Sequence, residues 1–498
     1  MAAVINTNIA SLNAQRNLNG SQGALQTSLQ RLSSGLRINS ARDDAAGMAI
    51  SQRMTAQIRG LDQARRNAND GVSMAQTAEG ALSGVGDMLQ RIRELAVQSA
   101  NATNSTSDRA ALQAEAGQLV SELDRVATAT QFNGLNLLDG TSGPSVFQVG
   151  ANANQTITTN GENFRTTSYG GYRIGASVAV SSNGIGDLTV GSTNNAIDSS
   201  ATAASRIAAN GNFTINGGAG TQVISYLAND SAKTVAATVN AQTSATGVTA
   251  SAFTEVDLTS ITASGSVSLS VTSDNATATT VAFSTGALAN ADGLAAGIKA
   301  FNNVSSSTGV TAKLNAAGSG ITLTNANGND IKLTNTSATA TLSVGTAVPF
   351  ALAAAGGSGV ATGKLTLDSD KAFGVSAASS TTDWFNAASA GGQLQKVNQV
   401  DVSSVASATR AIAQMDAAIA NVNSSRSDFG ALQNRFGNAI NSLQTTSENL
   451  SAARSRIMDT DFAAETSALT RAQILQQAGT AMLAQANQVP NQVLTLLR

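Results

Sequence analysis

The chain has 498 residues, enough for about three or four domains, and contains neither cysteine nor histidine, which excludes disulfides, thiolate or imidazole metal sites and His-dependent nucleophiles. Its formal net charge is -2 and only 12% of its residues are charged, so no global field attracts nucleic acid or anionic lipid. The hydrophobic fraction of 42% argues against a disordered chain, and neither a secretory signal nor an apolar run long enough to span a membrane is expected.

An apolar stripe at seven-residue spacing marks the N-terminal end. It consists of Leu18, Leu25, Leu29, Leu32 and Leu36. A lone amphipathic helix of this kind buries nothing by itself and carries the full entropy cost of ordering. We therefore expect this segment to be disordered or frayed in the free chain until a second stripe covers it.

Two longer helices are expected next, because apolar residues recur at helical spacing over residues 61–96 and 112–126. The first stripe includes three residues that we place in the core of a helical bundle, namely Leu82, Leu89 and Ile92. Ser40 and Asp43 have the spacing of a capping box, in which a hydroxyl and a carboxylate satisfy free amides at a helix start. Ser105 and Asp108 repeat that spacing, so both pairs predict helix starts.

The middle of the chain changes from the period of a helix to that of a strand. Residues 130–150 already predict turns and short strands that form a hairpin. Further on, Ile321–Thr324 and Ile331–Thr334 flank a six-residue loop containing Asn327-Gly328, which predicts a second hairpin. Residues 234–250 recur as 293–312, about sixty residues later. The repeat predicts two similar β-rich modules, each with one short helix.

A third long helix is encoded between residues 412 and 457, where one heptad position is apolar seven times in succession. These bundle-core residues are Met415, Val422, Phe429, Phe436, Leu443, Leu450 and Ile457. The C-terminal end again carries a single stripe. It consists of Leu475, Met482, Val489 and Leu496. Because neither terminal stripe is covered within its own helix, we expect the two ends to pair.

The predicted fold is therefore mainly α-helical arms, paired in a coiled coil or bundle, with a β-rich (α+β) central insertion. We place terminal arms at residues 1–44 and 455–498, which should be disordered in the monomer. A helical bundle with a β-hairpin should occupy residues 45–175 and 397–454. The surface-exposed β-rich insertion with its two repeats should occupy residues 176–396.

No group of residues in this sequence supports catalysis, a metal site or a cofactor. Asp43-Asp44 is a carboxylate pair, but nothing nearby supplies a third ligand, and favourable charge at a helix N-terminus explains it more simply. Arg91 and Leu95 lie one turn apart and share an outward edge beside the stripe that contains Ile92. An ordinary solvated helix edge is the simpler interpretation of that pair.

Several runs of the sequence are specific enough to suggest a family. They are Val4-Ile5-Asn6-Thr7-Asn8, residues 32–41, Asp43-Asp44-Ala45-Ala46-Gly47, residues 66–71, residues 89–99, Phe132-Asn133-Gly134, Gln433-Asn434-Arg435-Phe436, Ser455-Arg456-Ile457-Met458-Asp459 and Gln485-Ala486-Asn487. Together they resemble bacterial flagellin, the subunit of the flagellar filament. The resemblance covers about the first 150 and the last 95 residues, and the central repeat is similar to the internal module of many flagellins.

This resemblance implies a non-enzymatic structural subunit that self-assembles into an open helical filament for swimming motility. The terminal arms would form an inner tube, the bundle an outer tube, and the insertion would project into solvent. The resemblance further implies an extracellular protein, exported without a cleaved signal peptide. Its partners would be the flagellar type III export apparatus with its chaperone, the filament cap and the hook-junction proteins, with no nucleic acid and no membrane span.

The resemblance also implies recognition by a vertebrate Toll-like receptor, through residues that match Arg91, Leu95 and Glu115, and this favours a recognition role for the first two over a plain solvated edge. Two alternatives stay open. One is a hook-filament junction protein, which would show weaker versions of the runs above. The other is a filament subunit whose insertion acts as a glycan-binding adhesin.

Overall fold

The computed structural model describes residues 7–175, 197–198, 207, 210–261, 264–286, 290–315, 317–344, 350–353, 356–377 and 389–495. The chain forms two compact units. The first unit comprises Met1–Gln76, Pro144–Asn160 and Gly430–Arg498, and the second comprises Thr77–Gly143 and Gly161–Phe429. The helices are α1 Ile9–Ser34, α2 Ala45–Ala100, α3 Thr106–Ala129, α5 Ala232–Asn240, α6 Thr243–Thr246, α7 Ala291–Asn303, α8 Ser305–Thr308, α9 Val405–Met458 and α10 Phe462–Thr495, with a 3-10 turn at Val397–Gln399.

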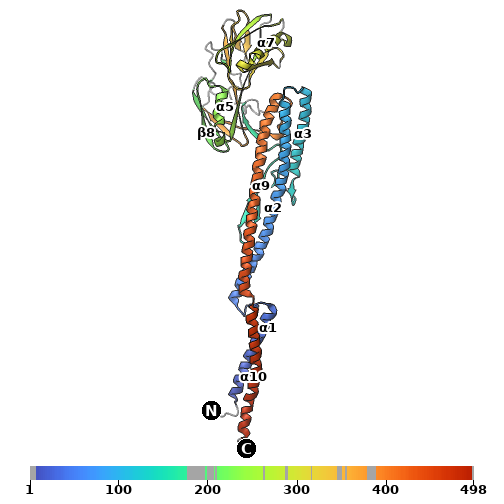
Figure 1. Ribbon diagram of the computed structural model, residues 1–498, viewed down its shortest axis with the longest axis vertical. Coiled ribbons are helices and arrows are strands. Elements are labelled where there is room, and N and C mark those ends of the chain that lie inside the picture. Colours follow the sequence, from blue (N-terminus) through green and yellow to red (C-terminus); the bar gives the residue numbers. More distant parts are fainter. Residues whose placement is uncertain are drawn as a thin grey trace. The chain divides into compact units, whose positions relative to one another are not determined.

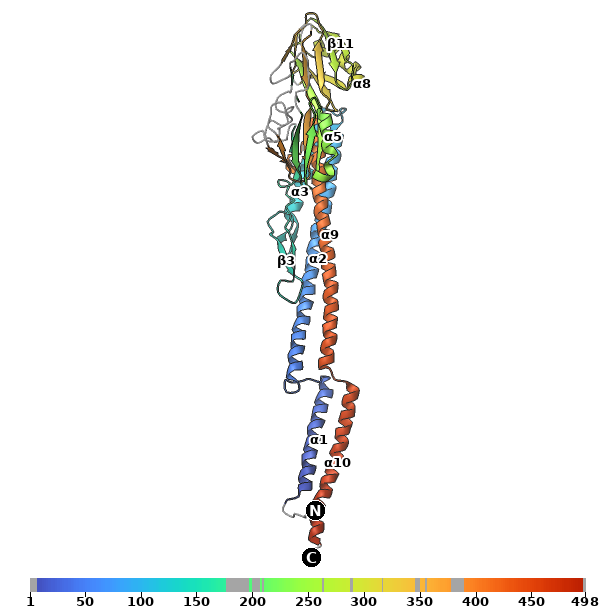
Figure 2. The same ribbon diagram turned by 90° about the vertical axis from the view of Figure 1, so that its left-hand side faces the viewer.

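The first unit is built from helix pairs. α1 lies beside α10, and the N-terminal part of α2 lies beside the C-terminal part of α9 (Figure 2). A short antiparallel bridge joins the two connections between these pairs, because Arg37 N donates to Met458 O at 2.6 Å and Thr460 N donates to Gly35 O at 3.0 Å. The helix α2 begins at Ala45, later than the predicted capping box at Ser40 and Asp43 indicated. These two residues form a turn, and Asp44 caps the helix by accepting from Gly47 N at 2.8 Å.

An aromatic contact attaches a small hairpin to the helices of the first unit. Strand β3 (Ser145–Gln148) pairs with β4 (Thr156–Thr159). Phe147 of β3 meets Phe436 of α9 edge to face, with ring centroids 5.5 Å apart. Phe436 is fully buried and fits over Gly71 of α2, where a Cβ would lie 2.5 Å from the ring atom Cζ. The glycine is therefore required by the close approach of the ring.

The second unit begins with a three-helix bundle of α2, α3 and α9 (Figure 1). At its centre, Leu82, Leu89, Ile92, Met415 and Val422 are fully buried, as the apolar periodicity predicts. The capping box at Ser105 is present: its side chain accepts from Asp108 N, and the Asp108 carboxylate accepts from Ser105 N.

The rest of the second unit is β-rich. Its strands, with the short pair that follows α3, are β1 Gln131–Phe132, β2 Leu135–Asn136, β5 Gly170–Ile174, β6 Ile197–Asp198, β7 Gly211–Asn216, β8 Thr221–Tyr226, β9 Val248–Thr259, β10 Ser266–Thr272, β11 Thr279–Ser284, β12 Val310–Leu314, β13 Ile321–Asn325, β14 Ile331–Asn335, β15 Leu342–Val344, β16 Phe350–Leu352, β17 Ser358–Ala361, β18 Lys364–Ser369, β19 Gly374–Ala377, β20 Ser389–Gly391 and β21 Gln393–Lys396. Their three larger sheets run β11-β10-β14-β17-β6, β12-β13-β9-β18-β5-β21 with β15 and β16 attached through β9, and β20-β19-β7-β8.

The hairpin predicted for residues 321–334 is wrong. β13 pairs with β12 and β9, whereas β14 pairs with β10 and β17 in another sheet. Leu323 and Leu333 nevertheless bury their side chains in one core, so the two strands face each other across the sheets. Alternating apolar residues show that each strand buries one face, but they do not distinguish a hairpin from such a corner.

The two copies of the sequence repeat have the same order of elements: a hairpin (β7-β8 or β10-β11), a helix (α5 or α7), a helical turn (α6 or α8) and a strand (β9 or β12). Asn240 at the end of α5 brackets Ala250 of β9, donating to its O at 2.8 Å and accepting from its N at 2.7 Å. Asn302 of α7 brackets Ala312 of β12 in the same way, at 3.0 and 2.7 Å. In each module, one asparagine side chain thus occupies the place of a neighbouring strand.

Candidate assembly surface

The antiparallel pair of α1 and α10 is joined through small residues. Asn8 Nδ2 donates to Ala486 O at 2.8 Å at one end, and Arg31 lies 3.8 Å from Glu465 at the other. Ala472 is almost fully buried, and a Cβ on Gly479 would lie 3.2 Å from Leu18 Cδ1. The face of α10 that meets α1 is therefore lined by alanine and glycine, which allows the two helices to approach closely.

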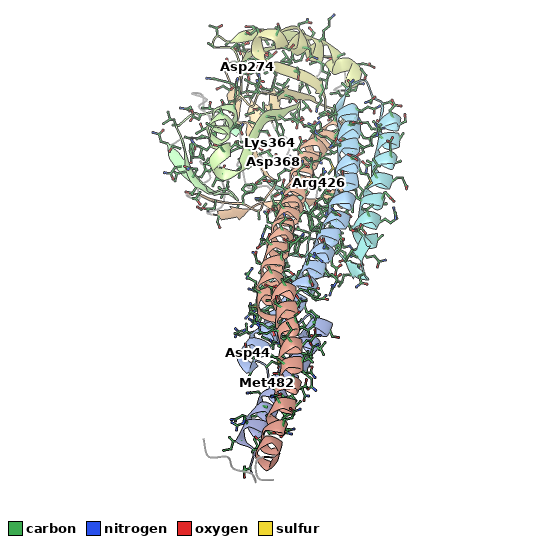
Figure 3. All side chains as sticks on the ribbon, turned by 60° about the horizontal axis from the view of Figure 1, so that its bottom comes forward. Asp44, Asp274, Lys364, Asp368, Arg426 and Met482 are labelled. Atoms are coloured by element: carbon green, nitrogen blue, oxygen red, sulfur yellow. The ribbon has the colours of Figure 1, made fainter. Side chains whose placement is uncertain are left out.

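The predicted terminal stripes are only partly covered by this pairing. In α1, Leu18, Leu25, Leu32 and the following Leu36 are half-buried, whereas Leu29 is 48% exposed. In α10, Leu475 and Met482 are 52% and 64% exposed, and Figure 3 labels Met482 on this helix. Leu496 and the side chain of Val489 lie outside the described residues. The expectation that the C-terminal stripe is buried by pairing with the N-terminal end is thus wrong for Leu475 and Met482, because α10 turns its small residues toward α1.

Further large apolar side chains extend this surface. Those that the heptad stripes missed are Ile9 at 61%, Leu12 at 51%, Phe462 at 65% and Ile474 at 59% exposed. A soluble monomer rarely exposes so many large apolar side chains on one pair of helices, and such surfaces generally mark contacts with other molecules. Ile474 directly precedes Leu475, which the heptad stripe includes. Two adjacent apolar residues at that point of the sequence could have predicted a wider apolar surface than the stripe alone.

Burial along α9 weakens toward its C-terminal end. Phe429 is 8% exposed in the second unit, and Phe436 and Leu443 are 0% and 8% exposed in the first. Leu450 and Ile457, predicted for the same core, are only half-buried. The bundle of the second unit surrounds α9 with two helices, whereas this end of α9 has one helix beside it, which explains the partial burial.

The three residues matched to receptor recognition differ in exposure. Arg91 Nη2 lies 2.8 Å from Glu115 Oε1, and Arg91 Nη1 lies 3.0 Å from Glu94 Oε2. Arg91 donates hydrogen bonds to both carboxylates, and these bonds, the one to Glu115 foremost, raise the pKa of Arg91 above its usual value. Leu95 is only 1% exposed, so its predicted position on an outward edge is wrong. The bundle packs α3 as well as α9 around α2, which widens the buried stripe to include Leu95.

Within the described part of the chain, no group of His, Cys, Asp and Glu side chains could hold a metal ion. None of the described helices combines the length and the apolar character that crossing a membrane requires.

Comparison with known proteins identifies the family. The model of the bacterial flagellin N-terminal helical region matches residues 5–143, that of the C-terminal helical region matches residues 412–497, and the flagellin hook IN motif matches residues 212–275. The chain is 43% identical to a B-type flagellin of Pseudomonas aeruginosa, 40% identical to a flagellin of Salmonella typhimurium and 34% identical to flagellin B of Vibrio cholerae, each over 100% of both chains. The chain belongs to the flagellin family. As a member, it is a structural subunit of the extracellular bacterial flagellar filament.

Solved structures of related proteins superpose only loosely on the whole chain. FliC from Burkholderia pseudomallei has a TM-score of 0.30 at 20% identity and covers 73% of this chain and 99% of its own. Flagellar hook associated protein-3 from Legionella pneumophila has a TM-score of 0.35 at 14% identity, with coverages of 82% and 98%. The family assignment rests on the sequence relatives.

Proposed function

We propose that the exposed apolar side chains of α1 and α10 are the contacts through which copies of this flagellin join into the filament. Six of them are between about half and two thirds exposed in the free chain, namely Ile9, Leu12, Leu29, Ile474, Leu475 and Met482. Covering the exposed half of each would contribute about 1 kcal/mol, or about 6 kcal/mol per copy. The single observation that carries this proposal is the exposure of Leu475 and Met482 on a helix that is already paired.

Family membership supports an open polymer. A surface that meets a different surface on the next copy makes a heterologous contact, and such contacts continue into a helical fibre instead of closing. We assign residues 1–44 and 455–498 to the inner tube, 45–175 and 397–454 to the outer tube, and 176–396 to the exposed insertion. Family membership supports export by the flagellar type III apparatus with its chaperone, and contact with the cap and the hook-junction proteins. It also supports a role without catalysis.

A polymerisation assay tests the proposal. Purified monomer with Met482→Ser is compared with Gln477→Ser, which changes an exposed polar residue of the same helix. We expect Met482→Ser to raise the critical concentration for filament growth about fivefold, since a loss of about 1 kcal/mol corresponds to that factor and 1.4 kcal/mol to a factor of ten. The monomer's unfolding midpoint should stay unchanged. Equal critical concentrations for the two variants, seen by electron microscopy and light scattering, would remove Met482 from the assembly surface.

Receptor recognition is a second proposal, carried by the exposed cluster of Arg91, Glu94 and Glu115. Leu95 would support this cluster from inside the bundle. Arg91→Ala should weaken signalling through the Toll-like receptor, with Arg125→Ala on α3 as the matched control, because Arg125 makes a comparable exposed ion pair with Glu122. Full signalling by the Arg91→Ala chain would contradict this role.

A further inference from the structure

The hairpin of β7 and β8 presents an open sheet edge in the insertion. β8 is the outermost strand of the sheet β20-β19-β7-β8, and among the described residues no strand pairs with its outer side (Figure 1). An edge strand offers a row of free N–H and C=O groups on which another strand can pair. Natural proteins usually block such edges with charged residues, proline, bulges or short length.

The strand β8 itself lacks these protections, and the nearest charge along the chain is Asp230, which accepts from Leu227 N just beyond the strand. From Gly211 to Asn229 the sequence contains no charged residue and no proline, and β8 pairs over all six of its residues with β7. Val223 is 58% exposed and Leu227, directly after the strand, is 62% exposed. These are the only large apolar side chains of the described insertion that are so exposed.

Four other edge strands in the described insertion are covered, charged, short or lined by small side chains. Asn302 caps β12 by bonding to Ala312, and β21 ends at Lys396. β20 is only three residues long. β11 is uncharged, but its outward side chains are Thr280, Ala282 and Ser284. Among the side chains that the structure describes, the exposure of large apolar residues on a sheet edge is therefore specific to β8.

We propose that β8 pairs antiparallel with β8 of a second copy of this chain, extending the sheet across two insertions. An isologous pair is self-complementary, so each strand must be a suitable partner for itself. Centred on Ile224, the pairing sets Val223 opposite Ser225 on the exposed face, with no like charges opposed. Leu227 N already donates to Asp230 Oδ2 at 2.7 Å, so the new backbone hydrogen bonds involve Val223 and Ser225, while Thr221 and Leu227 contact each other only through their side chains. A filament of this family holds identical insertions close together, so a second copy is the partner present at the highest effective concentration.

Cysteine cross-linking tests this pairing, because the native chain contains no cysteine. Full-length chains carrying Val223→Cys are mixed with full-length chains carrying Ser225→Cys, as monomers and as filaments, under mild oxidation. Opposite residues in an antiparallel pair have Cβ atoms about 4.5–5.5 Å apart, close to the distance that a disulfide needs. We expect disulfide-linked heterodimers in excess over mixtures of either variant with Ala282→Cys, on the β11 edge. Heterodimers no more abundant than in those controls would overturn the proposal.

A second measurement uses charge instead of cysteine. Leu227→Lys places a cation at the pairing edge and should abolish the insertion dimer in sedimentation velocity, whereas Thr280→Lys on β11 should retain it. Equal dimer fractions for the two variants would also overturn the proposal. Filament growth is scored in parallel. Normal filaments without the cross-link would refute the pairing while leaving assembly through α1 and α10 intact.

Discussion

The contact between Gly71 and Phe436 makes a prediction that opposes helix propensity. Replacing glycine by alanine inside a helix normally stabilises it by up to about 1 kcal/mol. At Gly71 the new Cβ would lie 2.5–2.9 Å from three atoms of the Phe436 ring, and such overpacking costs about 1–3 kcal/mol. Gly71→Ala should therefore be neutral to destabilising by about 2 kcal/mol. Gly437→Ala, in α9 with no neighbouring atom within 4 Å, should be stabilising.

A double-mutant cycle separates the contact from other effects. Phe436→Ala alone should cost about 3–5 kcal/mol, because the ring is fully buried. In that background the cavity accommodates the new methyl group, so Gly71→Ala should become stabilising, giving a coupling of about 1–3 kcal/mol. The measurement is urea unfolding of the monomeric chain, followed by circular dichroism and by a probe in the first unit. Gly71→Ala that stabilises as much as Gly437→Ala in both backgrounds would refute the reasoning.

Three further predictions concern the second unit. Arg173 and Asp368, the latter labelled in Figure 3, form an ion pair at 2.6 Å, and their side chains are 8% and 23% exposed. Asp368→Ala should lower the free energy of unfolding in urea by about 3 kcal/mol, and adding Arg173→Met should recover most of that loss. Additive losses in the double variant would contradict this. Ser105→Ala removes the capping box and should cost about 1 kcal/mol in thermal unfolding, whereas Thr106→Ala at the exposed neighbouring position should cost less. Burial raises the pKa of Glu162, opposed by a hydrogen bond from Ser425 and reinforced by repulsion from Asp428. A raised folded pKa means that stability is gained as pH falls through it, so Glu162→Gln should raise the unfolding midpoint at neutral pH and lose this advantage in acid; an advantage that does not change with pH would contradict the assignment.

The helices could be predicted from sequence because their buried faces are long and regular. The heptads from Met415 to Phe436 lie in the core, and the second capping box starts α3 where expected. The orientation of α10 could not be predicted the same way. Its large residues suggested the pairing face, whereas close helix approach selects Ala472 and Gly479. Apolar periodicity shows which residues need covering, but it does not show whether the same chain or another copy covers them.

The residues matched to receptor recognition could be predicted only in part for the same reason. Arg91 and Glu115 lie together as the resemblance implied, but Leu95 is buried because two helices, not one, cover that side of α2. Among the strands, the repeat was visible in sequence because Thr246-Gly247-Val248-Thr249-Ala250 recurs as Thr308-Gly309-Val310-Thr311-Ala312. The equivalence of Asn240 and Asn302 was not visible, because the register expected for the two helices set Asn240 against Lys299. The corner between β13 and β14 was not visible, because strand pairing depends on which distant strands, here β9 and β10, lie beside each one.

The asparagine brackets have a consequence for how this region can vary in sequence. In the first module the side-chain amide of Asn240 bonds to the backbone of β9, and in the second module that of Asn302 bonds to the backbone of β12. Each asparagine satisfies one edge of its strand at a single residue, while the other edge pairs with β18 in the case of β9 and with β13 in the case of β12. Substitutions at either asparagine should therefore expose one backbone N–H and one C=O without breaking the neighbouring ladder, so evolution can vary the side of the strand that the asparagine covers more easily than the side that pairs.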